Sequence, residues 1–137
     1  GSASSWQSST GNLIGIESNA TLWVRATTAT AVLATGMTWD TANTTAGTFL
    51  VAGGSGTTWK MTMPTVEQLF SIHPSARTGA ISTSGIVATA APYWSTETGA
   101  GDTARIVNWI ATNKNDSLLA KNQSAYLRPC LDLRTVR

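Results

Sequence analysis

The stretch YWSTETGAGDTARIVNW, from Tyr93 to Trp109, decides the fold class of this chain. Tyr93 and Trp94 each combine a large apolar surface with a polar group. The GAGD segment at residues 99–102 contains the glycines that allow the backbone to reverse, and residues 105–109 then alternate as a strand does. The stretch therefore predicts two antiparallel strands, the second of which pairs onward toward the C-terminus.

The composition describes one domain of ordinary size whose polarity comes mainly from Ser, Thr, Asn and Gly. Of the 137 residues, 12% are charged, which is about half of the usual quarter. A hydrophobic fraction of 42% and six Trp residues argue against disorder. The formal charge of +2, with scattered Lys and Arg, argues against a nucleic-acid partner. Since no run of about 18 apolar residues occurs, we expect no membrane-inserted segment.

Low charge and abundant Thr are typical of secreted or cell-surface bacterial proteins. The single cysteine, Cys130, cannot form an intrachain disulfide, so the domain must be held together by packing. Residues 1–12 are predicted to be a tag or linker and a tether anchored by Trp6, and residues 13–137 a single domain. We expect this chain to be a fragment of a longer protein.

Two short helices are predicted in the middle of the chain. In residues 64–72, Thr65 and Gln68 have the spacing of a capping box, and apolar residues follow at helical spacing. His73 lies before Pro74, which ends that helix. A second helix is expected within residues 37–46, with Thr38 as the N-cap and Gly47 as the stop.

Strand patterns surround these helices. We expect strands at residues 13–16, 21–26, 29–35, near 86 and at 117–120, and a last strand at 126–136 in which Pro129 requires an edge or a bulge. Trp39, Trp59 and Trp94 are expected in the interior, because a disulfide-free domain depends on such packing. Together these elements predict an α+β domain with a mostly antiparallel sheet.

Four segments, in this order, resemble a known family. They are MTWDTAN at residues 37–43, WKMTMPTVEQL at 59–69, YWSTE at 93–97 and AYLRPCLDLR at 125–134. The chain resembles the bacterial branch of the C-type-lectin-like fold, as found at the C-terminal tip of invasin- and intimin-type adhesins and, more distantly, in formylglycine-generating enzymes. The resemblance implies that Trp39 lies on the first helix, that Trp94 lies in the core below a loop-rich region, and that the terminal strands are adjacent.

The chain also departs from that family. Calcium-dependent lectins carry a Glu-Pro-Asn or Gln-Pro-Asp triplet and a Trp-Asn-Asp triplet, and neither occurs here. A formylglycine-type oxidase needs a pair of reactive cysteines. Arg128 and Arg134 would lower the pKa of an exposed Cys130 thiol, but we interpret Cys130 as a buried, inert residue.

Few other side chains are candidates for chemistry. We interpret His73 as a helix-closing residue, because no orienting partner is evident for it as a general base. Glu97 and Asp102 flank a glycine turn at a spacing that oxygen-ligated metals can use, but we interpret them as turn and strand-end residues. The sequence therefore predicts no enzyme, no metal and no cofactor.

The favoured function is a calcium-independent extracellular binding module at the tip of a bacterial surface adhesin. We expect immunoglobulin-like domains to precede it in a longer chain that is anchored in the outer membrane through its N-terminal part. The partner of the module would be a host surface protein, glycoprotein or immunoglobulin. Loops at residues 77–85, 99–102 and 112–116 are the expected binding region, with Arg77, Trp109, Asn113 and Lys114 as candidate contacts. Two alternatives remain: a metal-dependent carbohydrate-binding lectin or relative of formylglycine-generating enzymes, and a structural cap on a stalk.

Overall fold

A computed structural model describes residues 15–18, 20–24, 35–52, 58–72, 92–108 and 116–135. Within these ranges the chain forms helices α1 (Trp39–Ala46) and α2 (Val66–Ser71) and a C-terminal 3-10 helix, η3 (Leu133–Thr135). The strands are β1 (Gly15–Ser18), β2 (Thr21–Val24), β3 (Leu50–Ala52), β4 (Thr58–Lys60), β5 (Pro92–Gly99), β6 (Thr103–Asn108), β7 (Asp116–Ala120) and β8 (Cys130–Asp132).

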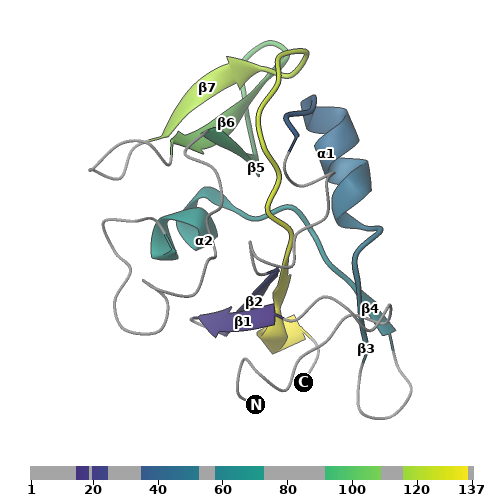
Figure 1. Ribbon diagram of the computed structural model, residues 1–137. Coiled ribbons are helices and arrows are strands. Elements are labelled where there is room, and N and C mark those ends of the chain that lie inside the picture. The colour runs from purple at the N-terminus through teal and green to yellow at the C-terminus, as the bar shows by residue number, and fades with distance from the viewer. Residues whose placement is uncertain are drawn as a thin grey trace.

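The strands form three small sheets, and every strand pair is antiparallel. The sheet orders are β1-β2-β8, β3-β4 and β5-β6-β7. Figure 1 shows β5-β6-β7 at one end of the molecule and β1-β2-β8 at the other, with α1 and α2 on opposite sides between them. The prediction of an α+β domain with two helices and mostly antiparallel pairing is thus confirmed, although the strands form three sheets.

The chain between β7 and β8 crosses the middle of the molecule and joins these parts (Figure 1). We call residues 125–133 the central segment. Its residues Ala125, Leu127, Arg128 and Cys130 are buried. It makes backbone hydrogen bonds to Met37 before α1, to Thr62 before α2, and to Pro92 and Trp94 of β5.

Both helices begin where the sequence predicts. α2 follows the capping box, in which the Gln68 amide donates to Thr65 Oγ1 at 3.1 Å and the Thr65 amide donates to Gln68 Oε1 at 2.8 Å. Thr38 is the N-cap of α1, but its hydroxyl donates to Thr41 Oγ1 at 3.0 Å and makes no cap bond. Gly47 ends α1 with right-handed geometry, so a left-handed cap is not what stops the helix.

Several strand predictions need correction. β1 lies at residues 15–18, two residues later than expected, and β4 was not predicted because three residues show no usable period. The predicted strand at 126–136 is confirmed only in part: within the described residues 126–135, the strand is Cys130–Asp132, and Pro129 precedes it. The chain then turns into η3, because Asp132 accepts bonds from the Arg134 amide and the Thr135 hydroxyl. The strands predicted at 29–35 and near 86 lie outside the described residues, apart from Thr35, which is in a bend.

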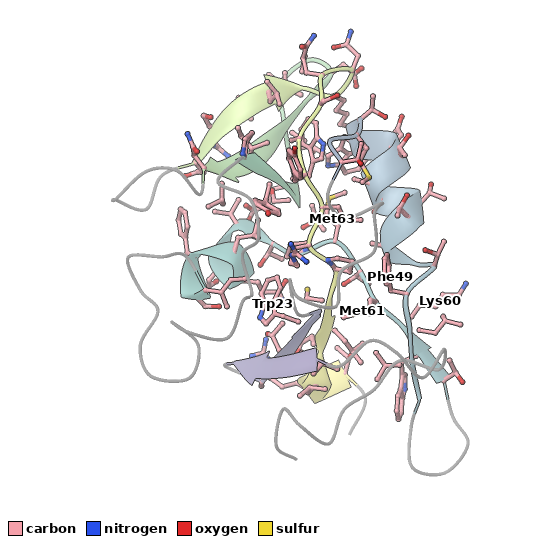
Figure 2. All side chains as sticks on the ribbon, viewed as in Figure 1. Trp23, Phe49, Lys60, Met61 and Met63 are labelled. Carbon is pink, nitrogen blue, oxygen red and sulfur yellow. The ribbon has the colours of Figure 1, made fainter. Side chains whose placement is uncertain are left out.

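The core consists of two clusters of buried side chains. The larger cluster packs α1, β3 and the β5-β6-β7 sheet around Trp94, and it includes Phe49, Met61 and Met63. The smaller one packs α2 against Trp23, Tyr93 and Cys130. Figure 2 shows Trp23 on the α2 side of the molecule and Phe49 and Met61 on the α1 side.

The prediction that Trp39, Trp59 and Trp94 all lie in the interior is correct only for Trp94. Trp94 is fully buried, whereas Trp39 and Trp59 are half-buried and pack on the edge of the larger cluster. Trp39 lies at the first turn of α1, where one face of its ring is covered by Lys121 Nζ, 4.2 Å from the ring centroid. Its Nε1 donates to the Ser95 carbonyl at 2.8 Å, and Trp94 Nε1 donates to the Met37 carbonyl at 2.7 Å. Trp23, which is also fully buried, was not predicted.

No helix of the described residues is both long and apolar enough to cross a bilayer.

Truncating Trp94 is expected to be far more damaging than truncating a half-buried tryptophan. Trp94→Ala empties the centre of the larger cluster and removes the indole hydrogen bond to the Met37 carbonyl, so it is expected to lower the free energy of unfolding by about 3–5 kcal/mol. Trp59→Ala is the matched control and is expected to cost clearly less. Urea denaturation of both variants measures the difference, and equal losses would contradict this description of the core.

The turn before β2 is expected to improve when Ala20 is replaced by glycine. Ala20 has φ 57, a left-handed conformation that strains a residue with a Cβ. Ala20→Gly is therefore expected to raise the free energy of unfolding by about 1 kcal/mol. Ala42→Gly, within α1, is the control and is expected to lower it. An Ala20→Gly variant that is less stable than the parent in urea denaturation would contradict the assigned geometry.

Candidate functional site

A polar cleft of about 450 Å³ is the candidate site that the described residues form. It lies between the start of β2, the exposed side of α2, and the end of β8 with η3. All of its lining side chains are polar or charged: Thr21, Thr65, Glu67, Gln68, Ser71, Asp132 and Arg134. These residues come from three distant parts of the sequence, so the cleft exists only in the folded domain.

The walls of the cleft are fixed by backbone pairing. β2 and β8 are antiparallel neighbours in a register that places Thr21 opposite Asp132. The Leu133 amide donates to the Ala20 carbonyl at 2.8 Å and holds η3 against the same hairpin. On the other side, Thr62 and Cys130 exchange two backbone bonds of 2.7 and 2.9 Å just before α2. The three elements therefore meet at a small number of strong backbone contacts.

Gln68 forms part of the lining and is held in one position. Its Oε1 accepts from the Thr65 amide at 2.8 Å in the capping box and from the Cys130 thiol at 3.6 Å. Both bonds use the oxygen, which leaves the Nε2 amide group without a partner among the described residues. Because the side chain is already ordered, a ligand that accepts from Nε2 would lose little of its binding free energy to ordering this group.

The charges of the cleft form one close pair and one separate carboxylate. Arg134 Nε and Nη2 donate to the two carboxylate oxygens of Asp132 at 3.0 Å each, and the Arg134 amide donates to Oδ1 at 3.0 Å. The side-chain bonds, followed by the amide bond, hold the pKa of Asp132 below its ordinary value. The same pair raises the pKa of Arg134. Glu67 is exposed and has no ion-pair partner in the described part of the chain.

A ligand in this cleft would meet acceptors and donors together. Glu67 offers a carboxylate, Gln68 offers amide hydrogens, and Arg134 keeps its Nη1 hydrogens after pairing with Asp132. Hydroxyl groups of Thr and Ser complete the lining. Such a surface suits a polar ligand whose groups both donate and accept, as at the wet protein interfaces that exchange many hydrogen bonds.

Cys130 lies beneath the cleft and is not a nucleophile there. The residue is fully buried, and burial, the largest cause, raises the pKa of its thiol to about 12. The nearby charge of Asp132 acts in the same direction and a hydrogen bond with Thr62 acts against it. The interpretation of Cys130 as a buried residue is confirmed, and the two arginines near it in sequence are not among the causes of its pKa shift.

The acidic residues beside the glycine turn have the structural positions that we predicted. Glu97 lies near the end of β5, and Asp102 lies in the turn before β6, with its carbonyl accepting from the Lys121 amide at 2.9 Å. Gly101 adopts φ 67 in this turn, a left-handed conformation that is unfavourable for residues with a side chain. Among the described residues, no three His, Cys, Asp or Glu side chains group together as a metal site would require.

The four contact residues predicted from the sequence, Arg77, Trp109, Asn113 and Lys114, lie outside the described residues, as does His73. Their placement therefore stays a prediction. The cleft was not predicted, because its polar residues belong to no common sequence motif. The one local signal was the Thr65 and Gln68 pair, which we interpreted only as a helix cap.

Comparison of the chain with known protein families, curated proteins and solved structures finds no match. Any functional argument therefore depends on the residues themselves.

The thiol of Cys130 is expected to be unreactive in the folded domain. With its pKa raised to about 12, almost none is thiolate near neutral pH, so a thiol reagent is expected to label it only as fast as the domain opens.

The raised pKa also makes stability fall between about pH 9 and pH 12, where the unfolded chain loses the thiol proton and the folded domain keeps it.

The labelling prediction is tested by comparing the rate of labelling with the rate of unfolding. The pH dependence is tested by urea denaturation of the parent and of Cys130→Ala across that pH range. The alkaline loss is expected to be smaller in the variant. Rapid labelling under native conditions would show that the thiol is exposed.

Proposed function

We propose that this chain is an extracellular binding module with a C-type-lectin-like fold, the terminal domain of a bacterial surface adhesin. In this proposal it recognises a host surface protein, glycoprotein or immunoglobulin without calcium. It follows immunoglobulin-like domains in a longer chain that is anchored in the outer membrane.

The observation that carries the binding function is the polar cleft on a rigid framework. Its lining residues belong to paired strands and to a capped helix, and Gln68 and Arg134 are held by hydrogen bonds. Preorganised polar groups lose less conformational entropy on binding than mobile ones do. The buried thiol and the absence of a grouped metal-ligand set among the described residues favour binding over catalysis.

The family assignment is supported by the order of elements. Trp39 begins the first helix, Trp94 is buried at the centre of the core, and β2 near the start of the chain pairs with β8 near its end. These are the positions that the resemblance implies.

The cleft is expected to contribute to partner binding. The immobilised domain is tested by surface plasmon resonance against immunoglobulins and solubilised host-cell surface proteins, with and without a chelator. The double variant Glu67→Gln and Arg134→Gln removes two ligand-facing charges from the exposed side of the cleft and is expected to weaken binding about tenfold or more. Binding of the parent is expected to be unchanged by the chelator.

Lys60→Gln is the matched control, because it removes an exposed charge on β4, on the opposite side of the molecule from α2 (Figure 2). A parallel variant with alanine at Arg77, Trp109, Asn113 and Lys114 tests the contacts predicted from the sequence. If neither set changes the affinity, both proposed surfaces are wrong. If the domain binds none of these proteins, the structural-cap alternative is favoured, and loss of binding with chelator would favour a metal-dependent lectin.

A further inference from the structure

Arg128 is a buried cation in which two of the three guanidinium nitrogens make no hydrogen bond to a described residue. Its side chain is 1% exposed, one of the largest fully buried side chains of the described residues. Nε and Nη1 are both buried, and neither has a hydrogen-bond partner among the residues that the structure describes. Nε belongs to one donating edge of the guanidinium group and Nη1 to the other, so neither edge forms a complete two-bond fork.

The described acidic side chains do not neutralise this charge. The ion pairs among the described residues join Arg105 to Asp116, Lys121 to Asp102 and Arg134 to Asp132. Outside these pairs, the carboxylates whose burial the structure describes, on Asp40, Glu67 and Glu97, are exposed. Burying a guanidinium group without a charged partner costs free energy.

Arg134 shows by contrast how the same group is satisfied elsewhere in the molecule. Its Nε and Nη2 form a two-bond fork with Asp132, although its side chain is 71% exposed and water is available. Arg128 has no such partner in the described part of the chain, where water is excluded and a partner matters most. Among the described arginines, the one without an ion pair is therefore the one that is fully buried, where an unpaired charge is most costly.

Within the described part of the chain, the Arg128 guanidinium group contacts an aromatic ring. Its guanidinium carbon lies 5.9 Å from the centroid of the Tyr93 ring, a cation–π contact that offsets only part of the desolvation. Tyr93 belongs to the smaller core cluster. Trp23, in the same cluster, is fully buried, and its Nε1 is also without an acceptor among the described residues. The three buried side-chain atoms of the described residues that lack a hydrogen-bond partner are therefore all nitrogen donors, which an anion could satisfy.

We propose that Arg128 anchors a buried anion site and that a small monovalent anion, chloride in ordinary saline, occupies it as a structural ligand. The anion supplies the missing negative charge and accepts from the guanidinium nitrogens. The site is separate from the polar cleft, and the proposal holds whatever partner the domain binds.

The test is thermal unfolding of the domain at constant ionic strength, with chloride replaced stepwise by fluoride, which is smaller and more strongly hydrated. Because an anion that binds only the folded state stabilises it by mass action, the parent is expected to melt about 5 °C higher at a chloride concentration ten times the dissociation constant. Arg128→Met keeps most of the side-chain volume and removes the charge. This variant is expected to melt at the same temperature in both salts, and in fluoride at least as high as the parent.

Arg134→Met is the matched control, since it removes an exposed arginine and is expected to keep the full chloride response. Crystals grown in bromide provide a second, independent measurement, and an anomalous peak within hydrogen-bond distance of Arg128 is expected. A parent melt that does not depend on the anion would overturn the proposal. The proposal would also be overturned if the Arg128→Met variant melted below the parent by the same amount in both salts. That result would mean that protein groups already satisfy the guanidinium group.

Discussion

Backbone hydrogen bonds of the central segment are the constraint on which the rest of this structure depends. Ala125 exchanges two bonds with Met37, Tyr126 is bonded to Pro92 and Trp94, and Cys130 exchanges two bonds with Thr62. These bonds connect residues far apart in sequence, so the ends of both helices and two of the three sheets are positioned by one stretch of chain. Because such contacts are non-local, they close long loops and must be stabilised by burial of the side chains around them.

The buried side chains on both sides of the central segment supply that stabilisation. Leu127 and Leu131 belong to the cluster around Trp94, whereas Cys130 belongs to the cluster under α2. The segment thus contributes to both clusters, and the indole bonds of Trp39 and Trp94 brace the chain before α1 against β5. The cleft begins where this segment ends, with Asp132 at the end of β8 and Arg134 in η3, and so it is fixed to the core.

Local chemistry made part of the fold predictable from the sequence. The start of α2 was predictable because Thr65 and Gln68 satisfy two helix donors within four residues, and the β5-β6 hairpin because its glycine turn and alternating strand are adjacent. β4 and the short β8 were not predictable, because three residues are too few for a period. The burial of Trp23 depends on its pairing with Cys130, more than a hundred positions away.

The cleft could not have been predicted for a similar reason. Thr21, Glu67 and Arg134 become neighbours only after β2, α2 and η3 meet, and none of them belongs to a motif with a fixed spacing. Arg128 was visible in the sequence only as a neighbour of Cys130. Its importance comes from complete burial without an acidic partner among the described residues, a property of the tertiary structure.

Native-state hydrogen exchange of the amides that the central segment engages is the most direct test of this account. In reducing buffer with a chelator, the amides of Met37, Thr62, Trp94, Tyr126 and Cys130 are expected to exchange only by global unfolding, with one common free energy of opening. If these amides instead open separately, at free energies well below that of global unfolding, the central segment does not hold the domain together.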